Sequence, residues 1–322
     1  MKVGIIGRGF GDRVVAPAFR ALDGCDVVEV VSPRDDAAVA ALCARTDLDL
    51  VSVHSPPFLH LDHVRRAVEA GHDVLCDKPF GVSAAEAATM RDLAAARGVL
   101  GLLNFENRFD PSRRAVHDAV VGGAIGRPEH VAFSALMAIT RTPPRPYGWL
   151  FDAAAGGGWL RAMGSHQIDF FRWTFGDIVE VAGQVRTAVR ERPDAAGQLR
   201  ECTADDGFVL ALRTDRDVSI VIDSSSAAAA NLPSSVLVVG EHGVVEERGG
   251  HVVVRTGEDA RELPTGGATA NPLVGAMQTY TRLVADAVRD RAVPPDVATF
   301  DDGLACARVM DAVAPVPAGT GS

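Results

Sequence analysis

Short apolar runs alternate with amphipathic stretches from Met1 to Leu103. The stretches repeat apolar residues at the spacing of a helix, whereas the runs are short and rich in Val, Ile and Leu. The runs are Val3–Ile6, Val27–Val31, Leu50–His54, Val74–Cys76 and Val99–Leu103, and the stretches between them are 13–22, 36–45, 60–70 and 84–97. This alternation predicts βαβ units and a doubly wound α/β domain whose parallel sheet is buried on both faces.

The pattern changes after a glycine-rich turn near residue 123. From there most apolar runs are joined by turns, and one long helical stretch lies at 159–175. The runs are 130–136, 179–188, 207–213, 218–224, 236–239, 243–247 and 251–255. This spacing predicts an α+β domain with an open, mostly antiparallel sheet and helices on one face. Two more helices are predicted at Leu273–Arg289 and Phe300–Ala314.

Two domains are expected, because 322 residues exceed what a single core usually organises. The first is assigned to 1–122 and the second to 123–298. A helix within 299–314 is expected to pack near the first domain. The Pro- and Gly-containing tail, 315–322, is expected to be disordered.

Composition narrows the possible functions. With 32 Lys and Arg against 42 Asp and Glu, the net charge of −10 opposes binding to nucleic acid or to an anionic membrane surface. No apolar stretch approaches the roughly 18 residues of a membrane span, and the N-terminus lacks the segments of a secretion signal. The five cysteines have no CxxC spacing, so we expect reduced core residues and no metal site. A cytoplasmic protein with a small polar substrate is predicted.

A glycine-rich turn follows the first predicted strand, in the segment GRGFGD at 7–12. Gly7 can make the tight turn, and Gly9 can let the backbone approach a pyrophosphate at the N-terminus of the next helix. Asp12 stands where the dinucleotide-binding fingerprint has Gly or Ala, one residue after Gly11. The motif favours a dinucleotide in a Rossmann domain, and a turn without a ligand is the alternative.

The end of the second strand distinguishes the two nicotinamide cofactors in such domains. Ser32 can donate a hydrogen bond to the 2′-phosphate of NADP, and Arg34 can pair with it. NADP(H) is therefore favoured. Asp35 keeps NAD(H) possible, and Arg34 as a solvated residue before a helix is the structural alternative.

Two further clusters carry titratable side chains. Lys78 follows the run ending at Cys76, at the carboxyl edge of the predicted sheet, where an ammonium can hold a substrate oxygen near a nicotinamide. His166 and Asp169 share one face of a helix that Gly156–Gly158 opens, and His166 can relay a proton near neutrality. A surface turn for Lys78 and a core histidine for His166 are the structural alternatives, and the glycine run makes close approach of a ligand more plausible.

Seven segments, taken in order, resemble the glucose-fructose oxidoreductase, inositol dehydrogenase and rhizopine catabolism (Gfo/Idh/MocA) family. They are GRGFGD, the DKP with Lys78, NFENRFDP at 104–111, GGAIGRP at 122–128, GGGWLRAMGSHQID at 156–169, ADDGF at 204–208 and TFDDGL at 299–304. The resemblance spans nearly the whole chain. It implies a Rossmann domain, an open sheet that often forms the subunit interface, and hydride transfer at a carbinol carbon of sugars, cyclitols or related polyols.

The resemblance also implies the site residues. Lys78 matches the lysine of the family's EKP motif, with Asp77 in place of Glu, and His166 matches the family's proton-relaying histidine. Family members often carry Asp four residues before that histidine, where this chain has Ala162, so proton transfer would depend on Lys78 and His166. The expected cofactor-binding residues are Gly7, Gly9, Phe10, Gly11, Ser32, Arg34, Ser55, Pro56, His60, Asp77, Lys78 and Asn107. The expected substrate-binding residues are Arg108, Tyr147, Trp149, Ser165, His166 and Asp169.

One departure from the family concerns the first domain. Only residues 32–49 separate the second strand from the third, which is room for one helix, whereas the family usually has a helix, a strand and a helix there. The edge strand and one helix should therefore be missing. The strand at 50–54 should lie beside the first strand, the second strand should form the edge, and binding of the adenosine end should be weaker.

The leading prediction is an NADP(H)- or NAD(H)-dependent dehydrogenase or reductase that acts on a sugar, sugar nucleotide or cyclitol, with Lys78 and His166 in proton transfer. Two alternatives remain open: a redox-neutral lyase or glycosidase that keeps its cofactor bound, and a non-catalytic dinucleotide-binding sensor. A homodimer or homotetramer through the C-terminal sheet is expected.

Overall fold

The computed structural model describes residues 1–265 and 272–315, which form two compact units. Unit 1 takes in the described residues of Met1–Asp110 and Ala268–Arg308, and unit 2 takes in those of Pro111–Gly267 and Val309–Ser322. The division at residue 110 differs from the boundary at 122 drawn from the sequence, because helix α5 (Pro111–Val121) packs against strands of the second unit. The tail predicted to be disordered lies, from residue 316 on, outside the described residues.

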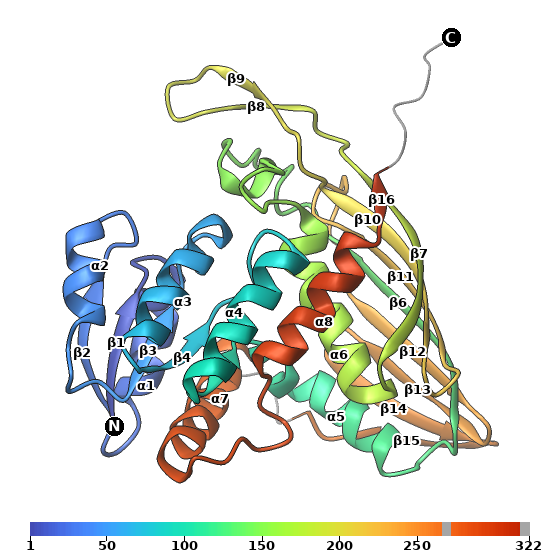
Figure 1. Ribbon diagram of the computed structural model, residues 1–322. Helices are drawn as coiled ribbons and strands as arrows, with labels where there is room; N and C mark the ends of the chain where they lie inside the picture. The colour runs from blue at the N-terminus through green and yellow to red at the C-terminus, as the bar shows by residue number, and fades with distance from the viewer. Residues whose placement is uncertain (266–271, 316–322) are drawn as a thin grey trace. The chain divides into compact units, whose positions relative to one another are not determined.

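Unit 1 is built on a parallel sheet with the strand order β2-β1-β3-β4-β5 (Figure 1). The strands are β1 (Lys2–Ile6), β2 (Asp26–Val31), β3 (Leu50–Val53), β4 (Asp73–Cys76) and β5 (Gly101–Leu103). Every residue of β3 and β4 is buried, as expected for strands covered on both faces. The predicted Rossmann-type sheet is confirmed.

The shortened first half of the sheet is also confirmed. Val3 pairs with Leu50 of β3 on one side and with Val27 of β2 on the other, so β2 forms the edge. Residues 33–48, all of them described, contain the helix α2 (Asp36–Cys43) and no strand. The connection is too short for a second crossover, because eight helical residues with their turns use nearly all of it.

Helices cover both faces of this sheet. Val3 and Ile5 pack in one cluster with Phe19 of α1 (Ala16–Arg20) and Tyr280 of α7 (Pro272–Asp290). On the other face, Gly4 lies against Leu42 of α2, and a Cβ at Gly4 would be 2.8 Å from Leu48. The remaining helices of unit 1 are η1 (Gly11–Val15), η2 (Pro57–Leu59), α3 (His60–Glu69), α4 (Ala84–Arg97), η3 (Glu106–Phe109) and α8 (Phe300–Asp311), whose last turn is grouped with unit 2.

Unit 2 is a mostly antiparallel sheet with the order β15-β14-β13-β12-β6-β11-β10-β7-β16. The pairs β6–β11 and β7–β16 are parallel. The strands are β6 (Pro128–Leu136), β7 (Ile178–Arg186), β10 (Gly207–Thr214), β11 (Ser219–Ser225), β12 (Ser235–Gly240), β13 (Gly243–Arg248), β14 (His251–Thr256), β15 (Asp259–Leu263) and β16 (Ala314–Pro315). The predicted open sheet is confirmed.

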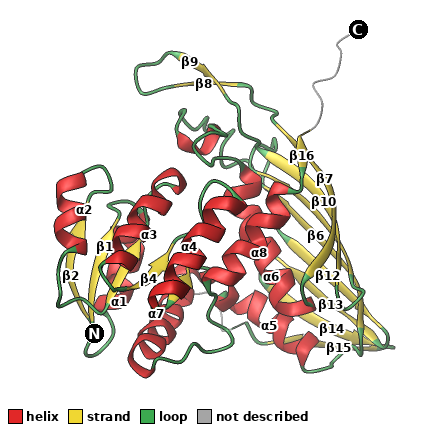
Figure 2. Cartoon of the chain, viewed as in Figure 1, coloured by secondary structure: helices red, strands yellow, loops and turns green. Residues whose placement is uncertain are grey.

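One face of the unit 2 sheet is covered by helices. Figure 2 shows α5 and α6 (Ser165–Phe175) beside the strands, and Phe171 of α6 packs edge-on against Phe133 of β6. A hairpin of β8 (Glu191–Pro193) and β9 (Leu199–Glu201) extends beyond the end of the sheet. The remaining helical turns of unit 2 are η4 (Trp149–Phe151) and η5 (Leu160–Gly164).

The hairpin and β15 were not predicted. The β15 sequence DAREL has four exposed residues and one half-buried residue, so it carries no alternation of apolar and polar positions. Four of the cysteines, Cys43, Cys76, Cys202 and Cys306, are buried as predicted, and Cys25 is half-buried. Among the described helices, none combines the length and hydropathy needed to cross a membrane.

Candidate active site

The glycine-rich turn leads from β1 into η1. Gly7 has φ +145°, and a Cβ there would lie 2.6 Å from the carbonyl oxygen of His54, so only glycine fits. At Gly9 no heavy atom lies within 4 Å of a Cβ position, which leaves the backbone open to a close-lying ligand. Gly11 packs against Ile5 and the His54 side chain, each 3.0 Å from its Cβ position. Gly11 thus supplies the tight helix–strand contact of the fingerprint's third glycine, one residue early, where the helix begins with a wide π turn.

The turn after β2 carries Ser32 and Arg34. Ser32 is half-buried and its Oγ accepts a hydrogen bond from the Arg34 backbone N–H at 3.3 Å, while Arg34 is exposed. Asp35 is the N-cap of α2, and its Oδ1 accepts a hydrogen bond from the backbone N–H of Ala38 at 3.0 Å. The Asp35 carboxylate, the acidic group that left NAD(H) possible as the cofactor, therefore caps helix α2.

The turn after β3 contains Ser55 and Pro56 and is supported by two buried histidines of α3. His60 Nε2 lies 2.7 Å from the Ser55 carbonyl oxygen, and His63 Nδ1 lies 3.0 Å from Ser55 Oγ. Burial lowers the pKa of His60, and it lowers the pKa of His63 to about 4. Both imidazoles are neutral near pH 7 and hold the turn in place.

The turn after β4 carries Asp77 and Lys78. Asp77 Oδ1 accepts hydrogen bonds from the Lys78 backbone N–H at 3.0 Å and from Asn104 Nδ2 at 3.2 Å. Burial alone would raise the pKa of Asp77, but a hydrogen bond from His54 and nearby positive charge bring this pKa below its usual range. The carboxylate is ionised, and it fixes the backbone that leads into the Lys78 side chain.

Asn107 and Arg108 lie on η3, after β5. Asn107 is half-buried, whereas Arg108 is 3 % exposed and its guanidinium reaches the Asp296 carbonyl oxygen and the Asp302 carboxylate, each at 3.4 Å. These contacts join two distant segments of unit 1. They give Arg108 a structural role, and the substrate contact expected from the sequence stays a prediction.

In unit 2, Ser165, His166 and Asp169 lie in the first turns of α6 and are buried. The helix is held at its start by Asp205, whose Oδ2 accepts a hydrogen bond from the Leu160 backbone N–H at 2.8 Å. Burial raises the pKa of Asp205 to about 6, although its backbone hydrogen bonds act in the opposite direction. Asp205 thus anchors the helix that carries His166.

The glycines before this helix have a structural explanation. A Cβ at Gly157 would lie 2.2 Å from the Trp149 carbonyl oxygen, and a Cβ at Gly158, with φ +112°, would lie 2.2 Å from Asp205 Oδ1. Protein atoms therefore occupy the space at both positions. The interpretation of these two glycines as room for a ligand is corrected accordingly.

The loop with Tyr147 and Trp149 is held by Arg192 of β8. Arg192 is 1 % exposed, and its Nη1 donates hydrogen bonds to the carbonyl oxygens of Thr140 at 2.5 Å and Arg145 at 3.1 Å. Its guanidinium also lies 4.1 Å from the centre of the Phe151 ring. Tyr147, Trp149 and Ala162 pack around an apolar cluster of Leu150, Phe151 and Cys202. A carboxylate in place of Ala162 would stand beside apolar side chains.

Sequence reasoning missed His54, Asn104, Asp205 and Arg192. His54 is the last residue of one predicted strand and Asn104 immediately follows another, so the rule that ligands bind at the carboxyl edge could have identified them. Asp205 bonds to Leu160, which is 45 positions away in the sequence, and Arg192 bonds to Thr140 and Arg145, which are 52 and 47 positions away. No local pattern indicates such contacts.

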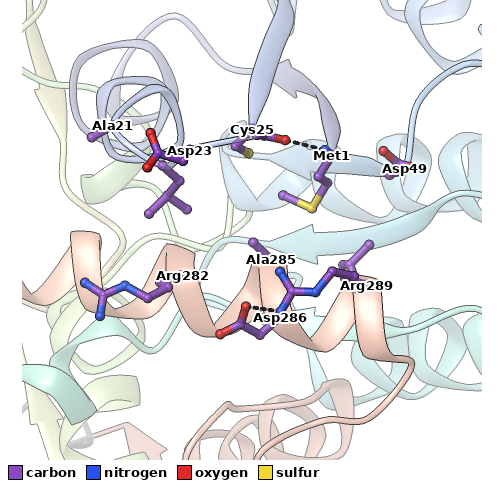
Figure 3. Close-up of a pocket in the computed structure, with 12 residues that line it drawn as sticks. Met1, Ala21, Asp23, Cys25, Asp49, Arg282, Ala285, Asp286 and Arg289 are labelled. Atoms are coloured by element: carbon purple, nitrogen blue, oxygen red, sulfur yellow. Dashed lines mark hydrogen bonds and ion pairs between the residues drawn. The ribbon is translucent and has the colours of Figure 1, made fainter.

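A cavity of about 820 Å³ lies at the opposite, amino-terminal edge of the unit 1 sheet. Figure 3 shows Arg282, Asp286 and Arg289 of α7 facing Met1 and Cys25 across it. The Met1 amine donates a hydrogen bond to the Gly24 carbonyl oxygen at 2.5 Å. The carboxyl ends of the strands, with Gly9 and Lys78, do not line this cavity. It is separate from the candidate cofactor site.

Two family models match the chain. One, described as an oxidoreductase family with an NAD-binding Rossmann fold, matches residues 1–105. The other, described as the GFO/IDH/MocA C-terminal domain, matches residues 113–246.

Individual relatives agree with these matches. An uncharacterized oxidoreductase of Synechocystis is 29% identical over 260 residues, which cover 76% of this chain and 70% of that protein. The dTDP-3,4-didehydro-2,6-dideoxy-alpha-D-glucose 3-reductase of Actinomadura kijaniata is 32% identical over 213 residues, which cover 61% of this chain and 63%, less than two thirds, of that enzyme. The structure of levoglucosan dehydrogenase in complex with NADH and levoglucosan has a TM-score of 0.84 at 20% identity and covers 97% of this chain and 95% of that one, which shows the shared fold.

Proposed function

The chain belongs to the Gfo/Idh/MocA family of NAD-binding oxidoreductases, and we propose that it transfers hydride between a nicotinamide dinucleotide and a carbinol or carbonyl carbon of a sugar, sugar nucleotide or cyclitol. The observation that carries this proposal is the Lys78 turn. Its backbone is fixed by the ionised Asp77 at the carboxyl edge of the parallel sheet, where such folds bind dinucleotides.

The residues of unit 1 fit a dinucleotide. Gly9 leaves open space beside the backbone, and η1 begins two residues later at Gly11, so backbone N–H groups can face a pyrophosphate. The nicotinamide supplies the hydride acceptor when the dinucleotide is bound. The protein then has to orient the substrate and move one proton.

Two residues take part in proton transfer in this proposal. Lys78 of unit 1 holds the substrate oxygen and stabilises charge that develops on it. His166 of unit 2 accepts the hydroxyl proton during oxidation and returns it during reduction. Ala162, packed against an apolar cluster, has no such function.

A preference for NADP(H) over NAD(H) is part of the proposal. It is supported by the exposed guanidinium of Arg34, by Ser32 beside it, and by the engagement of Asp35 as a helix cap. Replacing Arg34→Ala should weaken NADPH binding by about 1.5 to 3 kcal/mol and leave NADH binding unchanged, because a charge-assisted hydrogen bond to the phosphate is lost. Titration of both cofactors measures this, and equal NADPH affinity in the two proteins would reject the preference.

A second copy of the chain is the proposed macromolecular partner. Side chains along the strands of unit 2 point alternately to the buried core and to the opposite face of the sheet. One row of paired residues across that opposite face consists of Ala211, Val221, Ala132 and Leu237. The side chains of Val221 and Leu237 are 40% and 39% exposed. Exposed apolar rows of this kind are typical of subunit interfaces. Val221→Glu should lower the mass found by sedimentation equilibrium, and Leu232→Glu, outside the sheet, is the control. An unchanged mass would contradict this interface.

A substrate panel tests the proposed reaction. Wild-type protein is incubated with oxidised cofactor and polyols, or with reduced cofactor and keto-sugars, and absorbance at the nicotinamide band is followed. Turnover of at least one polyol supports the proposal. A bound cofactor that never turns over while the product changes would indicate a redox-neutral lyase or glycosidase, and tight binding without any product would indicate a sensor.

A further inference from the structure

A buried histidine lies directly beneath the glycine-rich turn. His54 follows β3, and its side chain is 0% exposed. Its Cβ lies 3.0 Å from the Cβ positions of both Gly7 and Gly11, and its ring centre is 6.0 Å from that of Phe10. The glycine-rich turn therefore packs against the backbone and Cβ of His54, and the Cβ position of Gly11 also lies 3.3 Å from Cδ2 of the imidazole ring.

The same imidazole is hydrogen-bonded to the turn that carries Lys78. His54 Nδ1 lies 3.2 Å from Asp77 Oδ2, and His54 Nε2 lies 2.7 Å from Ser52 Oγ. An ionised carboxylate only accepts hydrogen bonds, so Nδ1 carries the hydrogen. The other oxygen of Asp77 accepts from the Lys78 backbone and from Asn104. A continuous chain of hydrogen bonds thus runs from Ser52 through His54 and Asp77 to Lys78.

This chain contains the Ser–His–Asp order of a hydrolase, but Ser52 is not placed to act as a nucleophile. Ser52 is 0% exposed and lies inside β3, where it pairs with Ile5 of β1 and Leu75 of β4. A substrate carbonyl could not approach its hydroxyl. The network can therefore position groups but not attack a substrate.

We propose that His54 is the positioning residue of this site, holding the Asp77 carboxylate and thereby the backbone and side chain of Lys78 in register with the glycine-rich turn. The inference rests on the proposed function, in which Lys78 orients the substrate oxygen. It also accounts for Asp where the family's EKP motif has Glu. His54 Nδ1 already lies 3.2 Å from Asp77 Oδ2, so we expect a carboxylate one methylene longer, which extends about 1.5 Å further, to be crowded against the imidazole.

Turnover is one test. His54→Leu removes both hydrogen bonds at similar volume and should lower kcat about tenfold, while the substrate KM and the cofactor Kd change less than about threefold, because only the geometry at the reacting oxygen is disturbed. His54→Asn keeps a donor near the Nδ1 position and should recover most of the turnover. His72→Leu removes another buried histidine of unit 1, which bonds the Cys43 carbonyl oxygen, and should leave kcat unchanged.

Coupling between the two residues separates positioning from general loss of stability. The double variant His54→Leu/Asp77→Asn should lose no more kcat than the more impaired of the two single variants, because each substitution breaks the same contact. His54→Ala/Asp77→Glu should exceed His54→Ala in turnover, since the longer carboxylate gains room. Additive losses, or a kcat for His54→Leu equal to wild type, would overturn the inference.

A readout without cofactor or substrate makes the inference independent of the proposed reaction. In ¹⁵N NMR of the cofactor-free protein, the imidazole signal that disappears in His54→Asn should show a protonated Nδ1 at pH 7, and it should shift in Asp77→Asn. A His54 with hydrogen on Nε2 alone would contradict the proposal. If no polyol is turned over but this signature is present, the proposed function fails while the positioning network stands.

Discussion

In unit 1 most of the candidate residues stand at the ends of strands β1 to β4, whereas in unit 2 they stand on α6 and on the loop before it. The sheet fixes the backbone of the strand ends, and their side chains then bond to one another, as His54 does to Asp77. The helix and loop of unit 2 are held by single side chains, Asp205 and Arg192, from segments further along the chain. Substitutions in unit 1 should therefore affect chemistry, and substitutions of the supports in unit 2 should affect stability or substrate fit.

The largest effect is expected at a strand end of unit 1. Lys78→Ala should lower kcat by about 10² or more and leave dinucleotide affinity within a few-fold, because it removes the group that orients the substrate oxygen. Steady-state kinetics and cofactor titration measure both quantities. Lys2→Ala, which breaks an exposed ion pair with Asp47, is the matched control. Full turnover in Lys78→Ala would reduce Lys78 to a turn residue.

A large effect on stability is expected at the support of α6. The pKa of Asp205 is raised in the folded state, to about 6, so its contribution to stability is complete below pH 4 and is lost as the pH rises toward 6. Asp205→Asn can keep the hydrogen bond to Leu160 without the buried charge. Its free energy of unfolding, relative to wild type, should therefore rise by about 2 to 3 kcal/mol between pH 4 and pH 7.

Urea unfolding at the two pH values measures this difference. Asp259→Asn, an exposed carboxylate on β15, is the control and should show a much smaller change. The contrary result is that the free energies of unfolding of wild type and Asp205→Asn differ by the same amount at pH 4 and pH 7. In that case Asp205 has an ordinary pKa, and burial is not the main influence on this pKa.

A smaller effect is expected on α6 itself. His166→Asn should lower kcat about tenfold and remove one limb of the pH–rate profile, because Asn can bond to a substrate oxygen but cannot carry a proton near neutrality. The profile is recorded from pH 5 to pH 10. Two profiles of identical shape would make His166 a structural histidine.

The smallest effect is expected at the loop clamp. Arg192→Met keeps an apolar stem against Phe151 but removes the hydrogen bonds to Thr140 and Arg145, so the substrate KM should rise a few-fold with little change in kcat. Arg190→Met, an exposed arginine nearby, is the control. Equal KM values would show that the loop keeps its shape without the clamp.

The same contrast explains what could be predicted from the sequence. The order of the strands in unit 1, including the missing edge strand, followed from the short 32–49 connection and the buried apolar runs. Parallel topology then placed Gly9, Ser32, Ser55 and Lys78 at one edge. In contrast, the packing of Gly158 against Asp205 depends on distant segments meeting, and that of Gly157 against Trp149 depends on how the loop between them folds, and no periodicity encodes either. The partners of Arg108 could not be predicted for the same reason.

Transfer of deuterium tests the central claim most directly. A polyol that carries deuterium on its carbinol carbon is incubated with the protein and oxidised cofactor, and the mass of the reduced cofactor is measured. We predict reduced cofactor one mass unit heavier, formed with the wild type at a rate that Lys78→Ala lowers by about 10². Unlabelled reduced cofactor, or none from any polyol in the panel, would contradict hydride transfer by this protein.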